Sequence, residues 1–404
     1  MSELFRPTAQ LKISITPECN NDCAICLNKT TRTGNKNKRI LSEGKIRQLV
    51  DEGANLGMVG TYWTGGEPLI EYKNLLKLIE YSTKRGMIPT IVTNGGMIGA
   101  YGNYRELNKE LLKKASLYDI DTPDIVRSLK KAGLERVYFS VDNSHNTLES
   151  PNSRVSNCVP SELVAKSIRS FLKEGFGSIH KLDAIGHQLR ITATSSGMWH
   201  KPTNNIIQDV INKSGVGLKK LLTSNSSIYE NKEGQILLKR LGISNVGKAS
   251  TLGDNVLENK SGKNLFEICC NHFTPTNKAY DGGKYHRDLF IDWNGIVYTC
   301  GNHAYSIGNV FNESLSSIIE GVNKPKLDSE FAINRKVFHS LLVLSQNKRI
   351  GSNAIGEAFR LISLKNPELI KDIKTQCGAC NCLGNNKQLQ REFLKALDDN
   401  SVLH

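Results

Sequence analysis

The sequence predicts an α/β fold in which parallel strands form a barrel or an open sheet. Strand-like runs alternate with helix-like stretches over the first two-thirds of the 404 residues. This alternation is typical of parallel strands that are joined by right-handed crossovers. Hydrophobic residues make up 39% of the chain, which suffices for a buried core in one large domain or two ordinary ones. No stretch approaches the about 18 consecutive apolar residues of a membrane helix.

The predicted elements follow one another in a regular order. The first strand covers residues 11–16, where apolar and polar residues alternate until Pro17. Ser42 is a predicted helix N-cap, because apolar residues recur at helical spacing in the sequence that follows it. Further strands are predicted at 58–63, 89–92, 137–141, 189–194 and 218–222, and helices at 42–56, 72–85, 122–133 and 161–174.

Two segments interrupt this alternation, and the C-terminal third differs from the rest. Residues 95–121 are predicted to be an insertion with a short helix of its own, and the Asn-, Ser-, Gly- and Lys-rich residues 223–263 a loop-bearing linker. Residues 288–300 predict a hairpin around Asn294-Gly295, a strong turn signal. Helices are expected at about 314–322, 335–346, 354–364 and 386–398.

The charge and the cysteines narrow the function classes. Lys and Arg number 53 against 39 Asp and Glu, a net charge of +14, which favours anionic ligands but also fits a solvated basic surface. The N-terminus lacks the apolar run of a signal peptide, so cytoplasmic residence without membrane partners is expected. Structural disulfides are not expected in the cytoplasm, because it keeps thiols reduced. The ten cysteines cluster near both ends of the chain. Two metal sites are therefore predicted.

The N-terminal cysteines have the spacing Cys19-x3-Cys23-x2-Cys26, directly after the first predicted strand. Three thiolates on so short a loop can hold one face of an iron–sulfur cubane, whose fourth iron then lacks a protein ligand. Zinc also accepts thiolates, but a structural zinc site normally needs a fourth ligand, and no other His or Cys lies close in sequence. The spacing favours an iron–sulfur cluster.

With an apolar Ile25 before its third cysteine, this triad resembles the signature of the radical S-adenosylmethionine (SAM) superfamily. The resemblance continues after the second strand, where Gly65-Gly66-Glu67-Pro68 is similar to that family's motif for the SAM amine. A glycine pair lets the backbone approach the ammonium group, and Glu67 offers a counter-charge.

Further residues at strand ends extend the resemblance. Asn94 follows the third strand, and Ser140 and Asp142 end the fourth, where ligands of α/β barrels bind. The resemblance implies that Ser140 and Asp142 contact the SAM ribose, although a plain strand-end role fits them equally. Arg190 on the fifth strand is a candidate for the SAM carboxylate.

The resemblance also implies a fold and a chemistry. The fold is expected to be a partial (β/α)6 TIM-like barrel with a C-terminal auxiliary-cluster domain. A [4Fe-4S] cluster would cleave SAM reductively to methionine and a 5′-deoxyadenosyl radical, which abstracts hydrogen from a substrate C–H bond. The electron would come from a donor such as flavodoxin or ferredoxin.

The C-terminal cysteines resemble the auxiliary-cluster domain called SPASM, or its shorter twitch relative. Cys300 follows the predicted hairpin, and Cys377-x2-Cys380 fits the downstream element, although residues 310–376 separate the two unusually widely. One auxiliary [4Fe-4S] cluster is expected on Cys270, Cys300, Cys377 and Cys380, with Cys269 and Cys382 as alternates. A zinc site on the same four residues stays possible. Cys158 stands alone, as a buried small residue or a hydrogen-atom donor.

Three regions and one preferred function follow. Residues 1–230 are expected to be the radical SAM core, 231–263 a linker or insertion, and 264–404 the auxiliary domain. The family resemblance favours modification of a peptide or protein side chain. The alternatives are a sulfatase-maturase-like oxidation, or dehydrogenation or epimerisation of a sugar or aminocyclitol. The non-enzyme alternative is a zinc protein that binds nucleic acid, a partner that the enzyme hypothesis does not expect.

Overall fold

The computed structural model describes most of the chain. The described residues are 5, 7, 9–26, 40–150, 158–178, 187–194, 200–223, 226–241, 288–299, 303, 305–326, 330–345, 348–370 and 382–399.

A single large sheet organises these residues, with the strand order β13-β12-β11-β1-β2-β3-β4-β7-β10-β9-β8. Its parallel centre consists of β1 (Gln10–Thr16), β2 (Gly60–Gly65), β3 (Ile88–Thr93), β4 (Arg136–Ser140), β7 (Gln188–Thr194) and β10 (Gly234–Leu241). Among the described strands, the two at the ends of this order do not pair, so the sheet stays open. The prediction of an α/β fold with a partial barrel is confirmed.

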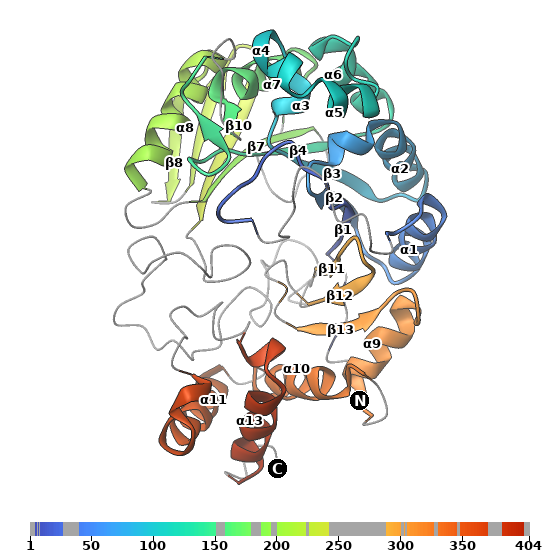
Figure 1. Cartoon of the computed structure of the whole chain (residues 1–404), viewed down its shortest axis with the longest axis vertical. Helices are drawn as coiled ribbons and strands as arrows, with labels where there is room; N and C mark the ends of the chain where they lie inside the picture. Colours follow the sequence, from blue (N-terminus) through green and yellow to red (C-terminus); the bar gives the residue numbers. More distant parts are fainter. Residues whose placement is uncertain are drawn as a thin grey trace.

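Helices cover the outer side of the sheet, which curves as an arc in Figure 1. They are α1 (Glu43–Asn55), α2 (Tyr72–Lys84), α6 (Thr122–Lys131), α7 (Ser161–Lys173) and α8 (His200–Ser214). The predicted cap of the first is confirmed, since the Ser42 side chain accepts a hydrogen bond from Lys45 N at 3.2 Å. Alternate strand residues such as Leu11 and Ile13 face these helices and are 0% exposed. The buried core therefore lies between the sheet and its outer helices.

Short elements fill the connections. They are the 3-10 helix η1 (Pro68–Glu71), helices α3 (Gly96–Gly99), α4 (Gly102–Leu107) and α5 (Lys109–Lys114), and strands β5 (Asn146–Thr147) and β6 (Val159–Pro160). The insertion predicted at 95–121 thus holds three short helices, not one.

The sixth parallel strand lies outside its predicted position. The run predicted as strand six forms β8 (Gly217–Thr223), which pairs antiparallel with β9 (Ser226–Asn231) at the sheet edge. The true sixth parallel strand, β10, occupies the segment interpreted as a linker. Asn231 explains why a strand begins in this segment. Its side chain accepts hydrogen bonds from Glu233 N and Gly234 N and so closes a tight turn between β9 and β10.

The C-terminal region extends the same sheet. The predicted hairpin is confirmed as β11 (Leu289–Ile291) and β12 (Ile296–Tyr298), with Gly295 at φ 81° in the turn. Unexpectedly, β11 pairs in parallel with β1. The next strand, β13 (Ser306–Asn309), pairs antiparallel with β12 at the end of the sheet. The four helices predicted here are confirmed as α9 (Leu315–Asn323), α10 (Ala332–Ser345), α11 (Lys348–Lys365) and α13 (Lys387–Asp399), with the 3-10 helix η4 (Pro367–Leu369) before the last.

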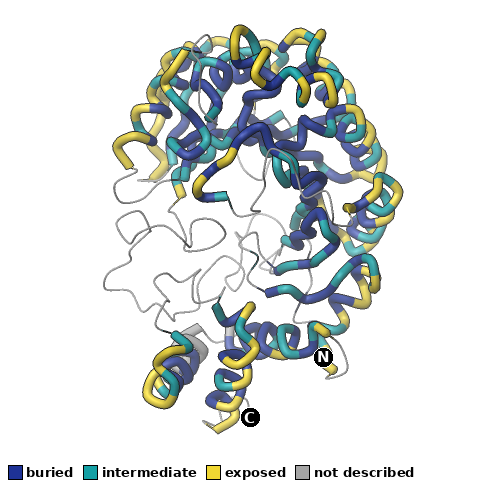
Figure 2. Tube along the Cα trace, viewed as in Figure 1, coloured by how far each residue is buried: buried dark blue, intermediate teal, exposed yellow. Residues whose placement is uncertain are grey.

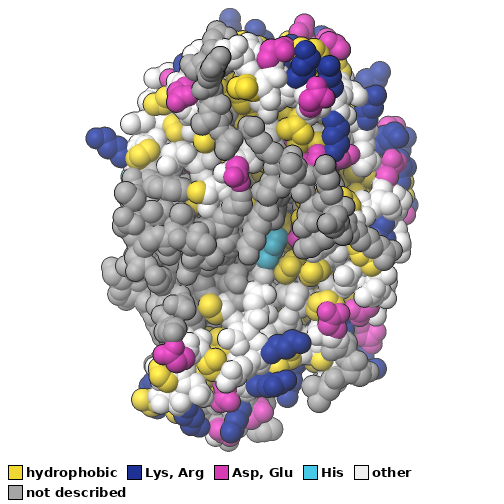
Figure 3. All heavy atoms as spheres, in the orientation of Figure 1, with side chains coloured by type: hydrophobic (Ala, Val, Ile, Leu, Met, Phe, Trp, Pro, Cys, Tyr) yellow, Lys and Arg dark blue, Asp and Glu magenta, His cyan; other side chains and the backbone are white. Residues whose placement is uncertain are grey.

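Buried and charged residues are distributed differently over the described residues. Figure 2 shows buried residues concentrated along the sheet and exposed residues on the outer turns of the helices. In the view of Figure 3, basic and acidic side chains are interspersed among the described residues. Within the described parts of the chain, no helix is long and apolar enough to cross a membrane.

Candidate metal and SAM site

The cysteine triad lies on the loop that follows β1, as predicted. Cys19 and Cys23 are buried, at 7% and 6% exposed, and Cys26 is half-buried. None of the three forms a disulfide. The loop turns back on itself through a hydrogen bond from Cys26 N to Cys23 O at 3.2 Å, and Asn21 Nδ2 anchors it to His145 O at 2.9 Å. The fold therefore presents three thiols on one short loop at the carboxyl edge of the sheet. This edge, with Cys19, Cys23 and Cys26, is called the cysteine edge below.

A buried amide network ties this loop to the end of β3. Asn94 Nδ2 donates to Asn20 Oδ1 at 2.8 Å and lies 3.9 Å from Cys19 Sγ. Asn20 Nδ2 in turn donates to Tyr104 Oη at 2.6 Å. The sequence analysis singled out Asn94 but missed Asn20 and Tyr104. The position of Asn20 directly beside Cys19 was the one signal that could have identified it.

The glycine pair at the end of β2 lies against the cysteine loop. Gly66 N donates to Thr16 O at 2.7 Å, and Glu67 N donates to Glu18 O at 2.9 Å. A Cβ atom on Gly66 would lie 1.7 Å from Glu18 O, and Gly65 has φ 130°, a conformation that side chains disfavour. Both glycines are thus required for the close approach of the two loops. Pro68 follows as the first residue of η1.

The Glu67 carboxylate is buried and bonded within the protein. It is 1% exposed, its Oε1 accepts from Thr93 Oγ1 at 2.8 Å and Leu69 N at 3.2 Å, and its Oε2 accepts from Asn94 N at 2.9 Å. Burial raises the pKa of Glu67 to about 7, although these three donors oppose the rise. Glu67 therefore fastens the loop after β2 to the end of β3. Its predicted contact with the SAM ammonium stays a prediction.

The turn after β4 is organised by Asp142. Its Oδ1 accepts from Ser144 N and from both the backbone N and the Nδ1 of His145, and its Oδ2 accepts from Thr194 N at 3.3 Å. Burial lowers the pKa of His145, but the charges of Asp142 and Cys23 outweigh burial and raise this pKa well above its usual value. His145 thus links Asp142 to the cysteine loop, a role that the sequence analysis missed.

The remaining candidates lie at two levels of the sheet. Ser140 ends β4 opposite Thr192, and the Cys158 thiol lies 3.8 Å from Ser144 O, so both are near the turn of Asp142. Arg190 lies deeper, as the third residue of β7, with its Cζ atom 4.8 Å from the centroid of the Tyr138 ring. The fold brings the first two to the cysteine edge but not Arg190.

The donor set at this edge fits an iron–sulfur cluster by its chemistry. Burial raises the pKa of Cys19 well above its usual value, and the charges of Cys23 and Glu67 raise it further. Thiolates in such surroundings need a cationic partner, which bound iron supplies. Among the described residues, no three His, Cys, Asp or Glu side chains are already arranged to hold a metal ion. The fold thus places the three thiols on one loop without closing them around a centre.

The auxiliary ligand set falls largely outside the described residues. Cys269, Cys270, Cys300, Cys377 and Cys380 lie there, so their expected cluster stays a prediction. Cys382 is described and is half-buried, shortly before α13.

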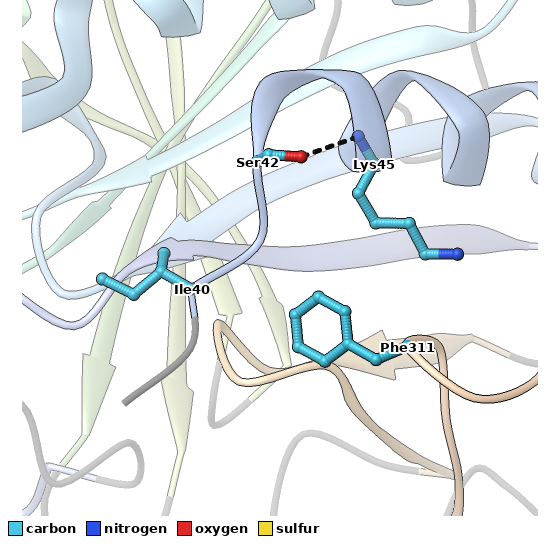
Figure 4. Close-up of a pocket in the computed structure, with 4 residues that line it drawn as sticks. All are labelled: Ile40, Ser42, Lys45 and Phe311. Atoms are coloured by element: carbon cyan, nitrogen blue, oxygen red, sulfur yellow. Dashed lines mark hydrogen bonds between the residues drawn. The ribbon is translucent and has the colours of Figure 1, made fainter. Parts of the chain in front are cut away.

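A shallow pocket is lined by four residues from two parts of the chain (Figure 4). It has a volume of about 280 Å³ and is lined by Ile40, Ser42 and Lys45 near the start of α1 and by Phe311 after β13. None of these residues belongs to the predicted site.

Two sequence families match this chain. Residues 13–181 match the radical SAM superfamily, and residues 284–338 match SPASM, an iron–sulfur cluster-binding domain. The first match includes the cysteine triad, the loop after β2 and the turn after β4, and the second includes the β11–β12 hairpin.

Curated relatives are similar over part of the chain. A GTP 3′,8-cyclase of Clostridium perfringens is 31% identical over 137 residues, which are 33% of this chain and 41% of the relative. A GTP 3′,8-cyclase of Clostridium acetobutylicum is 24% identical over 230 residues, 54% of this chain and 64% of the relative. The chain thus spans less than two-thirds of the length of these relatives.

Solved structures are similar at low identity. anSMEcpe with bound AdoMet is 12% identical with a TM-score of 0.46, covering 97% of both chains. BtrN in complex with AdoMet and 2-DOIA is 12% identical with a TM-score of 0.37, covering 85% of this chain and 89% of its own.

Proposed function

The chain is a radical SAM enzyme with a SPASM domain, and we propose that it abstracts a hydrogen atom from a C–H bond of a peptide or protein side chain. Its cofactors are SAM, a [4Fe-4S] cluster and auxiliary iron–sulfur chemistry from the SPASM domain. When bound, the cluster supplies one electron that splits SAM into methionine and a 5′-deoxyadenosyl radical, which becomes 5′-deoxyadenosine by taking the substrate hydrogen atom.

One observation carries this proposal: three chain segments that the SAM chemistry needs meet at one edge of the sheet. The cysteine loop contacts the glycine pair through Gly66 N and Glu67 N, and it contacts the end of β3 through Asn20 and Asn94. All three segments follow parallel strands, and the carboxyl ends of such strands are where α/β barrels bind ligands.

Each residue then has a distinct task. Cys19, Cys23 and Cys26 would hold the cluster. The backbone of Gly65 and Gly66, which lies against the cysteine loop because only glycine fits there, would face the SAM amine, and Glu67 would hold that backbone in place. Asp142 would orient His145 beside Cys23 and fix the turn that faces the SAM ribose. The electron would come from an external one-electron donor such as flavodoxin or ferredoxin.

A second substrate class has its own support. The curated relatives are named GTP 3′,8-cyclases, which favours a nucleotide as the alternative to a peptide. The two classes are separable by experiment, because a true substrate accelerates the formation of 5′-deoxyadenosine. Incubating the reconstituted enzyme with GTP or with candidate peptides should identify the class, and a nucleotide-only response would contradict the peptide proposal.

The chemistry itself is tested by replacing Cys19, Cys23 and Cys26 together with Ala. We expect 5′-deoxyadenosine formation to disappear, because the cluster loses all its protein ligands. Iron should fall from about eight atoms per chain to about four, as expected for the loss of one of two cubane clusters. Undiminished SAM cleavage would contradict the assignment of the triad. A wild-type content of about four irons with one zinc would contradict only the auxiliary cluster.

A further inference from the structure

The inner face of the sheet carries basic and aromatic side chains that the cysteine edge does not use. Tyr62 on β2 is in register with Lys12 on β1, and Tyr138 on β4 is in register with Arg190 on β7. Lys239 on β10 is in register with the residue two positions after Arg190. Residues in register share a face, and so do residues two apart on one strand, so all five belong to the face opposite the outer helices.

These side chains contact one another across the strands. The rings of Tyr62 and Tyr138 lie 5.8 Å apart at 66°, across the small Thr90 of β3. Lys12 Nζ lies 5.1 Å from the Tyr62 centroid, and Arg190 Cζ lies 4.8 Å from the Tyr138 centroid. A guanidinium held over an aromatic ring keeps N–H donors available for a further partner.

The charges of this group do not balance. Lys12 pairs with Asp288, whose carboxylate lies 2.5 Å from its Nζ. Among the described residues, neither Arg190 nor Lys239 has a carboxylate within ion-pair distance. The Nε of Arg190 is buried without a hydrogen-bond partner. Burial lowers the pKa of Lys239, and the charges of Arg190 and Lys12 lower it further. Arg190 and Lys239 thus lie on one face of neighbouring strands, and within the described parts of the chain no carboxylate pairs with either, so an anionic group of a ligand would stabilise both.

We propose that Arg190 and Lys239 bind an anionic group of the substrate, a carboxylate or a phosphate. A guanidinium suits two parallel hydrogen bonds to such a group, and the ammonium adds a point charge. The inference rests on the proposed function, because a substrate on this face lies below the edge where SAM would bind.

The level of Arg190 in the sheet distinguishes this subsite from the cysteine edge. Thr194 marks the cysteine edge, because its backbone N donates to Asp142. Arg190 precedes it by four residues, which places its backbone about 13 Å lower along the strand. A substrate anion below that edge is therefore within reach of Arg190, whose predicted contact with the SAM carboxylate stays a prediction.

Anion binding by the reconstituted, SAM-loaded enzyme tests the inference. Inorganic diphosphate and citrate are titrated separately by calorimetry, and at least one should saturate at one molecule per chain. Arg190→Gln and Lys239→Gln should each weaken this binding about tenfold or more. Lys131→Gln, which removes an equal charge from the exposed outer side of α6, should change it less than about twofold. Lys239→Arg keeps the charge and should restore most of the affinity.

Each outcome has one meaning. Weakened diphosphate binding identifies a phosphate site, and weakened citrate binding a carboxylate site. Wild-type protein without saturable binding, or Arg190 and Lys239 variants that bind like Lys131→Gln, overturns the inference. The formation of 5′-deoxyadenosine by the same wild-type preparation is measured in parallel. Its absence would contradict the proposed function, whereas its presence with unchanged anion affinities would overturn only the subsite.

Discussion

The two faces of the central sheet differ although the same strands build both. On the outer face, Ile13, Trp63 and Phe139 are 0% exposed against helices. On the inner face, the residues directly before two of them, Lys12 and Tyr62, are only partly buried and contact charged or aromatic groups. The outer face thus holds the apolar core, whereas the inner face carries polar, charged and aromatic side chains. A register shift of one residue would exchange the two faces, so both depend on the same strand pairing.

The largest predicted effect is a difference in unfolding free energy between a substitution on the outer face and one on the inner face. Phe139→Ala removes a fully buried ring, whose centroid lies 5.8 Å from that of Phe171, and should lower the free energy of unfolding by about 3–5 kcal/mol. Thr192→Ala on the inner face of β7 should lower it by about 1 kcal/mol or less. Urea unfolding of both variants gives the comparison. Equal losses would show that the inner face is as important for stability as the outer one.

At the cysteine edge, the addition of one methyl group at Gly66 should weaken SAM binding. Gly66→Ala would place Cβ 1.7 Å from the Glu18 carbonyl oxygen and force the two loops apart. We expect SAM affinity to fall about tenfold or more, since this displacement removes the backbone that would face the SAM amine.

A matched glycine provides the control for this variant. Gly44 in the first turn of α1 has no atom within 4 Å of a built Cβ, so Gly44→Ala should leave SAM affinity unchanged and stabilise the helix by about 0.5–1 kcal/mol. Calorimetry with SAM and thermal unfolding measure both. A Gly66→Ala enzyme that binds SAM normally would show that the loop adapts.

Glu67→Gln should reveal how this edge is held together. The amide keeps one acceptor oxygen but directs an NH2 group at a backbone or hydroxyl donor, so stability should fall by about 1–3 kcal/mol. SAM affinity should fall together with the melting temperature, because the loop loosens. Lower SAM affinity at an unchanged melting temperature would instead indicate a direct contact between Glu67 and SAM.

The smallest predicted effect concerns the aromatic end of the inner face. His303 stacks on Tyr298 with ring centroids 4.5 Å apart at 12°, and burial lowers the pKa of His303 to about 4 from 6.5. The native ring therefore stays neutral while the unfolded chain gains a proton, so stability falls as the pH drops from about 6.5 to about 4.

This pH dependence gives a direct measurement. Between pH 7.5 and 5.5 the His303 contribution to the free energy of unfolding should decrease by about 1 kcal/mol. His303→Phe keeps a stacked ring without a titratable group, so its loss of stability over this interval should be smaller by that amount. An identical pH dependence in both proteins would show that the ring is not kept neutral.

Much of the site could be predicted because its residues lie next to strand ends. The cysteine spacing, the glycine pair and the turn of Asp142 each follow a run with clear strand character, and parallel strands bring their carboxyl ends together. The roles were less predictable. Glu67 and Asp142 look like ligand groups in the sequence, yet their oxygens accept hydrogen bonds from neighbouring loops. His145 had no local signal, because its place beside Cys23 depends on how two distant loops pack.

The sequence by itself determined the alternation of strands and helices, the positions of the thiols along the chain and the family to which they point, since all three are encoded within short windows. Only the tertiary structure decided that β10 rather than β8 continues the parallel sheet and that β11 lies beside β1. It also decided that Arg190 and Lys239 lie on the same face of two neighbouring strands. Pairing between strands that are far apart in sequence depends on hydrogen bonds and burial that no local pattern specifies, and the charge around a residue depends on that pairing.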